Sequence, residues 1–381
     1  MEFETMSSAF AGLKTHTSDD DDAARPAGGT RGAATGKEPI GSKVGADARR
    51  RERQLFRDSI KAGRRPPRRG EEEEEGAIPV YRRAWETSFG GVFGSFDDET
   101  ALGPMRYTSG PIPENAVPAS TLQIFSVRVT DLKGLWWPLH VYGLVAARDG
   151  ADHNRNFLFR RTRDNCQILT KEDPVLLLTG PSRAVVLAGL VTFEVQLLVK
   201  SKTELLGDRV LASKVFCFRQ GSRREDSICT RIPYKHCTLE FALAPLWHSV
   251  EATVSVQLVD GSWPDGHQGL VFSCTDSIKD TKMLLLDCPD GRMPIGPDGM
   301  FELSRRVVCA ELGGRDKLMV SVQARRVGFL TRNAAVFEPK MSGTSVGMCD
   351  LRFCKMQVTV AWSLLSTSGT HAGGKQQGLS G

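Results

Sequence analysis

Short segments in which apolar and polar residues alternate recur from residue 121 onward, and they constrain the fold more than any other feature of the chain. A period of two places alternate side chains on opposite faces of an extended strand, so it is typical of strands buried on one side. The clearest segments are 121–130, 191–200, 249–259, 317–324 and 355–362. Turn-forming stretches such as DLKG, RDG and GPDG lie between the strand-like segments. The pattern predicts an all-β fold of antiparallel sheets packed as a sandwich.

The β region repeats a motif at a fixed distance. Trp137-Pro138 is followed, after four residues, by a Gly-Leu-Val that begins at Gly143. Trp263-Pro264 is followed in the same way by a Gly-Leu-Val that begins at Gly269, which gives an offset of 126 residues. An indole covers one face of a sheet and proline ends ladder pairing, so the motif is expected to be structural. The repeat predicts two related β units, 121–248 and 249–365.

A second repeated motif, Cys-x-Leu-x-Phe, begins at Cys237 and again at Cys349, an offset of 112 residues. This shorter offset predicts that the second unit lacks much of the basic loop around 220–231.

Residues 1–76 cannot build a core, because they are rich in Gly, Ala and charged residues and poor in aromatic and β-branched ones. Blocks of like charge follow one another there, which predicts a disordered arm. Its arginine clusters at 49–53 and 64–69 have the spacing of a two-part nuclear import signal, or they are simply part of a solvated arm. Residues 77–120 contain Gly, Pro and scattered aromatic residues and are expected to form an extended lead-in rather than a helix. Residues 366–381 are expected to be a flexible tail.

Composition excludes some classes of function. Fifty basic and 45 acidic side chains give a formal net charge of only +5, which does not point to nucleic acid. No apolar run reaches the roughly 18 residues that a membrane span needs, and no signal peptide is evident. We therefore expect an intracellular protein, cytoplasmic or nuclear, with an unknown protein partner. Its nine cysteines form no zinc-like pattern and are expected to be reduced and mostly buried.

Several longer motifs occur in order along the β region. They include PMRYTSGPIP (104–113), WPLHVYGLVAARD (137–149), HNRNFLF (153–159), VDGSWPDG (259–266) and KMQVTVAWSLL (355–365). Together these residues resemble the plant family called domain of unknown function 6598, over about 104–365. The resemblance implies no activity that can be carried over. Some family members are joined to a ribosome-inactivating N-glycosylase domain, but the N-terminal part of this chain is too short and polar and lacks a Glu-Ala-x-Arg helix.

One stretch is dense in hydrogen-bonding side chains and is a possible ligand loop. His153, Asn154 and Arg155 are followed shortly by Asp164 and Asn165. These groups either hold a polar ligand or tie two loops together.

Other candidates have ordinary structural explanations. Residues 343–347 fit G-x-S-x-G, but a nucleophile elbow needs a following helix, so a plain loop is expected. Aspartates at turns either bind Ca²⁺ or bond to the local backbone: Asp131, Asp149, Asp152, Asp164 and Asp173. His236, Cys237 and His248 are either metal ligands or ordinary hydrogen-bonding residues. A basic loop either docks acidic partners or is solvated: Arg219, Arg223, Arg224, Arg231 and Lys235.

The sequence therefore assigns no catalytic, cofactor-binding or metal-binding residue. It favours a non-enzymatic interaction or scaffold module. The alternative is an enzyme-associated plant defence module, suggested by the fusions within the family. An enzyme would show a concave site with mutually bonded acid, base or nucleophile groups, whereas an interaction module would show an exposed patch.

Overall fold

The computed structural model describes residues 4–5, 73–201, 207–219, 227–314 and 316–366. Apart from one helix, α3 (Glu73–Phe93), the regular structure of these residues is β. Every pair of named strands is antiparallel, including the central pairs β3–β6, β10–β13 and β9–β16. The all-β, antiparallel prediction is confirmed.

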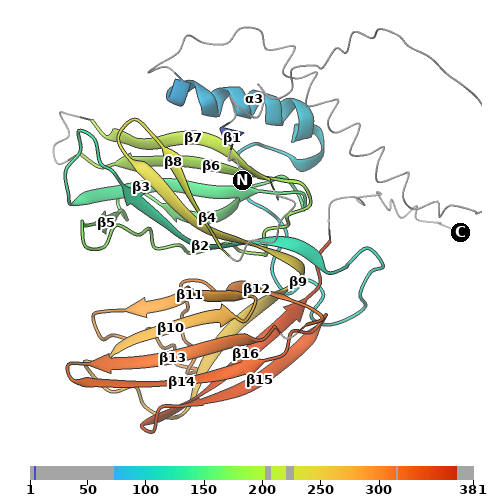
Figure 1. Ribbon diagram of the computed structural model, residues 1–381, viewed down its shortest axis with the longest axis vertical. Coiled ribbons are helices and arrows are strands. Elements are labelled where there is room, and N and C mark those ends of the chain that lie inside the picture. Colours follow the sequence, from blue (N-terminus) through green and yellow to red (C-terminus); the bar gives the residue numbers. More distant parts are fainter. Residues whose placement is uncertain (1–3, 6–72, 202–206, 220–226, 315, 367–381) are drawn as a thin grey trace, which may run out of the picture.

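The first half of the molecule contains two facing layers (Figure 1). Sheet A has the order β1-β7-β6-β3-β4, with β5 also paired to β3. Its strands are β1 (Glu4–Thr5), β3 (Leu139–Arg148), β4 (Asn156–Arg161), β5 (Gln167–Leu169), β6 (Leu190–Val199) and β7 (Arg209–Arg219). The opposite layer consists of β2 (Ala119–Thr130) and β8 (Ile228–Pro233), which both pair with the first part of β9 (Thr238–Gly261).

The second half repeats this arrangement. Sheet B has the order β11-β10-β13-β14, formed by β10 (Gln268–Thr275), β11 (Ile278–Cys288), β13 (Leu318–Arg326) and β14 (Phe329–Phe337). The facing layer has the order β12-β9-β16-β15. It uses β12 (Val307–Glu311), β15 (Gly343–Asp350), β16 (Cys354–Ser363) and the second part of β9.

Strand β9 joins the two halves. Its residues pair with β8 as far as Leu243 and with β2 as far as Ser249. Beyond that point its partners are β12 and β16. The change of partners falls at His248, whose φ is 45°. The predicted boundary between 248 and 249 thus lies inside one 24-residue strand that both halves share.

The alternating side chains of these strands fill two separate cores. The first core contains the stacked rings of Phe193 and Phe216, with Phe241 against both. The second core contains Val322 and Trp362, both fully buried. Burying each such side chain contributes about 1.5–3 kcal/mol, so each half has a hydrophobic core of its own.

The two halves have the same strand order. The sequence β4-β3-β6-β7 in sheet A corresponds to β11-β10-β13-β14 in sheet B. The hairpin before the last strand matches as well: Tyr234 N bonds Cys237 O, and Leu351 N bonds Cys354 O. Cys237 therefore corresponds to Cys354, an offset of 117 residues. The predicted match of Cys237 with Cys349 is wrong, because Cys349 lies one strand earlier, in β15.

The two Trp-Pro motifs stand just before β3 and β10. Trp137 packs against the first core, and Trp263 packs against Phe301 and Phe353 in the second. The paired glycines differ in what they require. Gly143 has φ of 113° and would place a Cβ 2.1 Å from the backbone oxygen of Gln196, so glycine is needed there. A Cβ on Gly269 would meet the flexible side chain of Met293, 1.9 Å from its Sδ, and that side chain would have to shift.

Residues 77–93 do not form the extended lead-in that the sequence predicts. They lie in α3, which continues through Pro79 and starts within the predicted arm. Its buried residues Ile78, Tyr81 and Trp85 follow a helical spacing and face sheet A. This tertiary packing stabilises a segment whose glycines and proline argue against a helix.

Other predictions concern residues outside the described ranges. Glu4 and Thr5 pair with β7, so this small part of the predicted arm is a strand. The arginine clusters at 49–53 and 64–69, and the tail beyond residue 366, lie outside the described residues.

Candidate functional site

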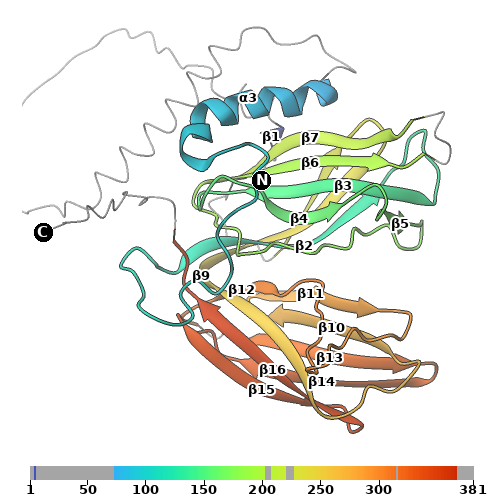
Figure 2. The same cartoon turned by 180° about the vertical axis from the view of Figure 1, so that it is seen from behind.

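Helix α3 lies over the outer face of sheet A, as Figure 2 shows from behind. Aromatic side chains hold it there. Trp85 is 1% exposed, and its Nε1 donates to the carbonyl of His153 at 2.9 Å. The ring of Phe89 stacks on the imidazole of His153 with centroids 4.0 Å apart. Because His153 lies in the loop between β3 and β4, these contacts hold the helix against that loop.

A buried ion cluster lies beneath the helix. Glu194, on β6, accepts hydrogen bonds from Arg148 Nη2 at 2.8 Å and from Arg155 Nη2 at 2.6 Å. Arg148 also lies 4.1 Å from the ring centroid of Phe96, and Arg155 forms an ion pair with Asp97 at 2.8 Å. Each charge in the cluster is thus paired with an opposite charge, as buried charges require.

A second cluster joins the β3–β4 loop to residues 182–186. Arg183 is 4% exposed and bonds Asp149 at 2.7 Å and Asp152 at 2.9 Å. Burial disfavours the charged guanidinium, but Asp149 and Asp152 outweigh it, and the pKa of Arg183 lies above its ordinary value. Asp149 also accepts from the backbone N of Val186 at 2.7 Å. This cluster fixes two loops of the first half to each other.

Glu251 extends the connection to the second half. Its carboxylate accepts from Met105 N at 2.8 Å and from Ala184 N at 2.7 Å. Burial raises the pKa of this carboxyl above its usual range. Since Glu251 lies on the shared strand β9, it ties the segment after α3 and the first half to the second.

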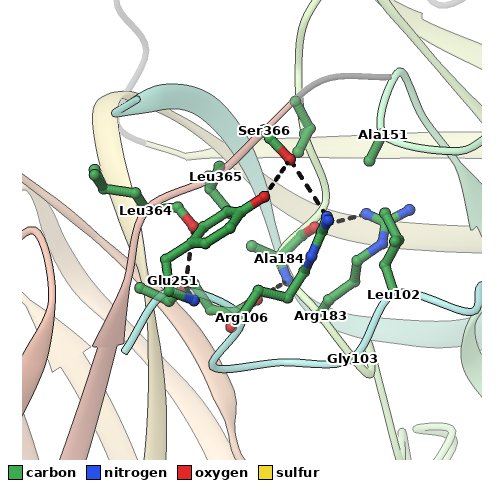
Figure 3. A pocket seen from close by; sticks show the side chains of 13 residues that line it. Leu102, Gly103, Arg106, Ala151, Arg183, Ala184, Glu251, Leu364, Leu365 and Ser366 are labelled. Atoms are coloured by element: carbon green, nitrogen blue, oxygen red, sulfur yellow. Dashed lines mark hydrogen bonds between the residues drawn. The ribbon is translucent and has the colours of Figure 1, made fainter. Parts of the chain in front are cut away.

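A small cavity lies at this junction, between Arg106, Tyr107, Arg183 and Glu251 (Figure 3). Tyr107 Oη lies 3.0 Å from Ser366 Oγ, and Arg106 Nη1 donates to the same oxygen at 3.3 Å. The cavity volume is about 20 Å³, which is space for one water molecule. The charged groups around it are engaged in bonds between elements: Glu251 with Met105 N and Ala184 N, and Arg183 with Asp149.

The structure separates the two parts of the predicted ligand loop. His153, Asn154 and Arg155 lie together beneath α3, where Asn154 Nδ2 donates to Phe93 O at 3.1 Å. Asp164 and Asn165 lie beyond the opposite end of β4, about 20 Å away at the rise of six strand residues. There Asn165 accepts from Arg161 at 3.3 Å. The structure thus brings together only the first three residues.

The other residues selected from the sequence lie apart from one another. Residues 343–347 form strand β15 rather than the predicted loop, and Ser345 Oγ accepts from Trp362 Nε1 at 3.0 Å. Asp131 pairs with Arg231. His236 bonds the carbonyl of Lys133 at 3.0 Å. Within the described ranges, no group of three or more His, Cys, Asp or Glu could hold a metal ion.

The basic loop is only partly described. Arg219 ends β7 and Arg231 lies in β8, while Arg223 and Arg224 lie outside the described residues.

Sequence reasoning missed Glu194, Arg148 and Arg183, the centres of the ion clusters. No local signal marks them. Glu194 lies with Thr192 and Gln196 on the polar face of 191–200, where a solvated charge is the ordinary expectation. Its burial and its partner depend on tertiary contacts, because Arg148 is 46 residues away.

The second half presents a different surface along strands β14 and β15, which end their sheets. We call it the β14–β15 edge, defined by Phe329, Leu330, Val336, Val346 and Met348. Their exposed fractions are 49, 60, 56, 59 and 49%. Among the described residues, β14 pairs only with β13, and β15 only with β16. In the first half, the strand that corresponds to β14 is β7. It pairs with β6 on one side and β1 on the other, and α3 packs on it.

The family described as domain of unknown function (DUF6598) matches residues 121–360. The chain belongs to this family. The matched range covers both sandwiches and excludes α3. No curated protein matches the sequence significantly.

Among solved structures, the chain is similar to a pair of C2 domains from extended-synaptotagmin 2, at 8% identity and a TM-score of 0.21. That likeness covers 71% of this chain and 99% of the other. It is also similar to human GIVD cytosolic phospholipase A2, at 7% identity and a TM-score of 0.22, over 66% of this chain and 33% of the phospholipase. No helix in the described ranges is long and apolar enough to span a membrane.

Proposed function

We propose that this DUF6598 protein is a non-enzymatic interaction module whose two β units, 121–248 and 249–365, form one rigid support. Its partner is another protein rather than a membrane or a nucleic acid, and it acts inside the cell. The buried acids and bases at the junction support this proposal because each is engaged in joining α3, the loops and the two halves. His153, Asn154 and Arg155 act as ties between loops, whereas Asn165, next to Asp164 at the far end of β4, bonds locally to Arg161.

The observation that carries the proposal is the β14–β15 edge. An edge strand offers unpaired backbone groups, and proteins usually protect such strands with charges, prolines or a covering segment. Here five large apolar side chains are exposed along the two edge strands, and exposed apolar surface of this kind marks interaction sites. The equivalent strand β7 indicates the binding mode, since it receives the added strand β1 through Phe216 and Cys217.

The partner would therefore add an extended segment to β14. Backbone hydrogen bonds would provide affinity, and pockets for alternate side chains would provide specificity. Leu330 and Val336 lie on one face of β14 and would contact apolar residues of the added strand. Arg332 lies between them on the same face and is exposed, so an acidic residue of the partner fits opposite it.

The test places a photo-crosslinking amino acid at position 336 of the full chain, in extract from cells that express the protein. Val259, on β9, provides the matched control because it is exposed to 49% but lies outside the edge. We expect a crosslink from position 336 to one extended, acidic-apolar segment of another protein, and none from position 259. Leu330→Lys should abolish that crosslink. Identical products from both positions, or a product containing only a second copy of this chain, would contradict the proposal.

A further inference from the structure

Strand β5 brings a cysteine next to a histidine, away from the junction and from the β14–β15 edge. Cys166 directly precedes β5, and its Sγ lies 3.8 Å from Nδ1 of His140 on β3. The two strands pair at Leu139–Val141, with His140 opposite Ile168. Both Cys166 and His140 are half-buried, so small molecules in solution can reach the pair.

The backbone around the pair is well anchored. Gln167, the next residue, donates through Nε2 to Val175 O at 2.9 Å and accepts from Leu177 N at 2.9 Å. On the other strand, the carbonyl of His140 accepts from Lys200 N at 2.8 Å. These bonds anchor the two strands that carry the thiol and the imidazole, and a nucleophile and its base require such support.

The other cysteines lack these conditions. Six of the nine are buried: Cys217, Cys237, Cys288, Cys309, Cys349 and Cys354. Burial raises the pKa of Cys349 and of Cys354 to about 11. These two cysteines are close in sequence but are therefore poorly suited to redox chemistry. Cys229 is exposed, but burial of its thiol and the nearby Glu240 raise its pKa. Burial and Asp276 do the same for the pKa of Cys274.

We propose that Cys166 is a site of reversible modification by low-molecular-weight disulfides, with His140 as its base. The imidazole takes the thiol proton, and the thiolate attacks one sulfur of the disulfide. A new sulfur–sulfur bond forms to Cys166 while the original bond breaks. The released thiolate takes the proton back from the imidazolium. Cys166 and one half of the disulfide are joined, the other half leaves as a free thiol, and no further oxidant is needed.

The test treats the full chain with glutathione disulfide at pH 7 and follows each cysteine by peptide mass spectrometry. We expect the mixed disulfide at Cys166 to form first, on the order of 10-fold faster than at Cys229, because the imidazole of His140 is placed to take the thiol proton during the attack. His140→Ala should slow the reaction at Cys166 about 10-fold or more and leave Cys229 unchanged.

His236→Ala serves as the matched control, because His236 is also half-buried but bonds a carbonyl. It should not alter the rate at Cys166. Circular dichroism checks that each variant is folded. Faster reaction at Cys229 or Cys274, or an unchanged rate at Cys166 in His140→Ala, would overturn the proposal. Neither result would bear on binding at the β14–β15 edge, which lies in the other half.

Discussion

The outer faces of sheets A and B are built on the same strand order but carry different residues. In sheet A, Ala146 faces Glu194 across β3 and β6, and Glu194 faces Val215 on β7. In sheet B, Phe272 faces Ser321, and Ser321 faces Ala334 on β14. The buried carboxylate of the first half therefore corresponds to a serine in the second.

The neighbouring positions differ in the same way. Arg148 of β3 corresponds to Cys274 of β10, and Cys217 of β7 corresponds to Val336 of β14. Helix α3 covers the first set, and no described residue forms a helix over the second (Figure 1). In the first half, charged residues lie where another part of the chain covers them. In the second half, Val336 stays exposed on the surface where we propose that a partner binds.

The largest expected effect comes from removing the buried carboxylate of sheet A. Glu194→Ala leaves two buried guanidinium groups without their shared partner, and we expect a loss of about 4 kcal/mol in the free energy of unfolding. The matched control is Ser321→Ala, which removes a hydroxyl that bonds Asn333 O at 3.2 Å. That control should cost about 1 kcal/mol. Denaturant titration measures both, and equal costs would remove the distinction between the two faces.

A somewhat smaller effect is expected from the helix that covers sheet A. Trp85→Ala removes a fully buried indole and its hydrogen bond, for a loss of about 3 kcal/mol. Hydrogen exchange should also show faster exchange throughout 73–93, because the helix depends on its packing. Val336→Ala, at the exposed position of sheet B, should change stability by no more than about 0.5 kcal/mol. A cost for Val336→Ala similar to that of Trp85→Ala would mean that the β14–β15 edge is covered within the chain.

The sequence predicts the strands well, but it does not predict helix α3, which covers sheet A. Segments 121–130 and 191–200 correspond to β2 and β6 within one or two residues at each end, because period-two burial is a local property of the chain. The Trp-Pro repeat also places β3 and β10 in equivalent positions. Helix α3 was missed because Gly90, Gly91 and Pro79 weaken its local signal, and only its contact with sheet A stabilises it.

The sequence also predicts only part of the candidate site. His153, Asn154 and Arg155 were selected for their hydrogen-bonding capacity, and the structure places them in hydrogen bonds beneath α3. Asp164 and Asn165 were grouped with them because they are near in sequence, but β4 carries them to the other end of the strand. The exposed apolar edge was not predicted, because alternation alone does not reveal which strand lacks a neighbour.

The smallest effect concerns Glu251, which ties the two compared halves together. Its pKa is raised in the folded protein, so the folded state holds the proton more tightly than the unfolded state. The stability that this contributes is fully present below the ordinary value near 4.5 and is lost as pH rises through the folded pKa. Between these values, the free energy of unfolding should decline by no more than about 1.4 kcal/mol per pH unit.

Glu251→Gln removes the ionisation and should flatten this part of the stability profile. Unfolding of both proteins by denaturant from about pH 4 to pH 7 measures the difference. Glu311→Gln, on β12, serves as a control, because Glu311 is also a buried carboxyl of the second half but accepts from Trp247 N rather than from residues of the junction. Parallel profiles for the wild type and Glu251→Gln would show that Glu251 is charged in both states. Its two backbone hydrogen bonds, from Met105 and Ala184, would then stabilise the anion enough to offset its burial, and the junction would hold the halves together independently of pH.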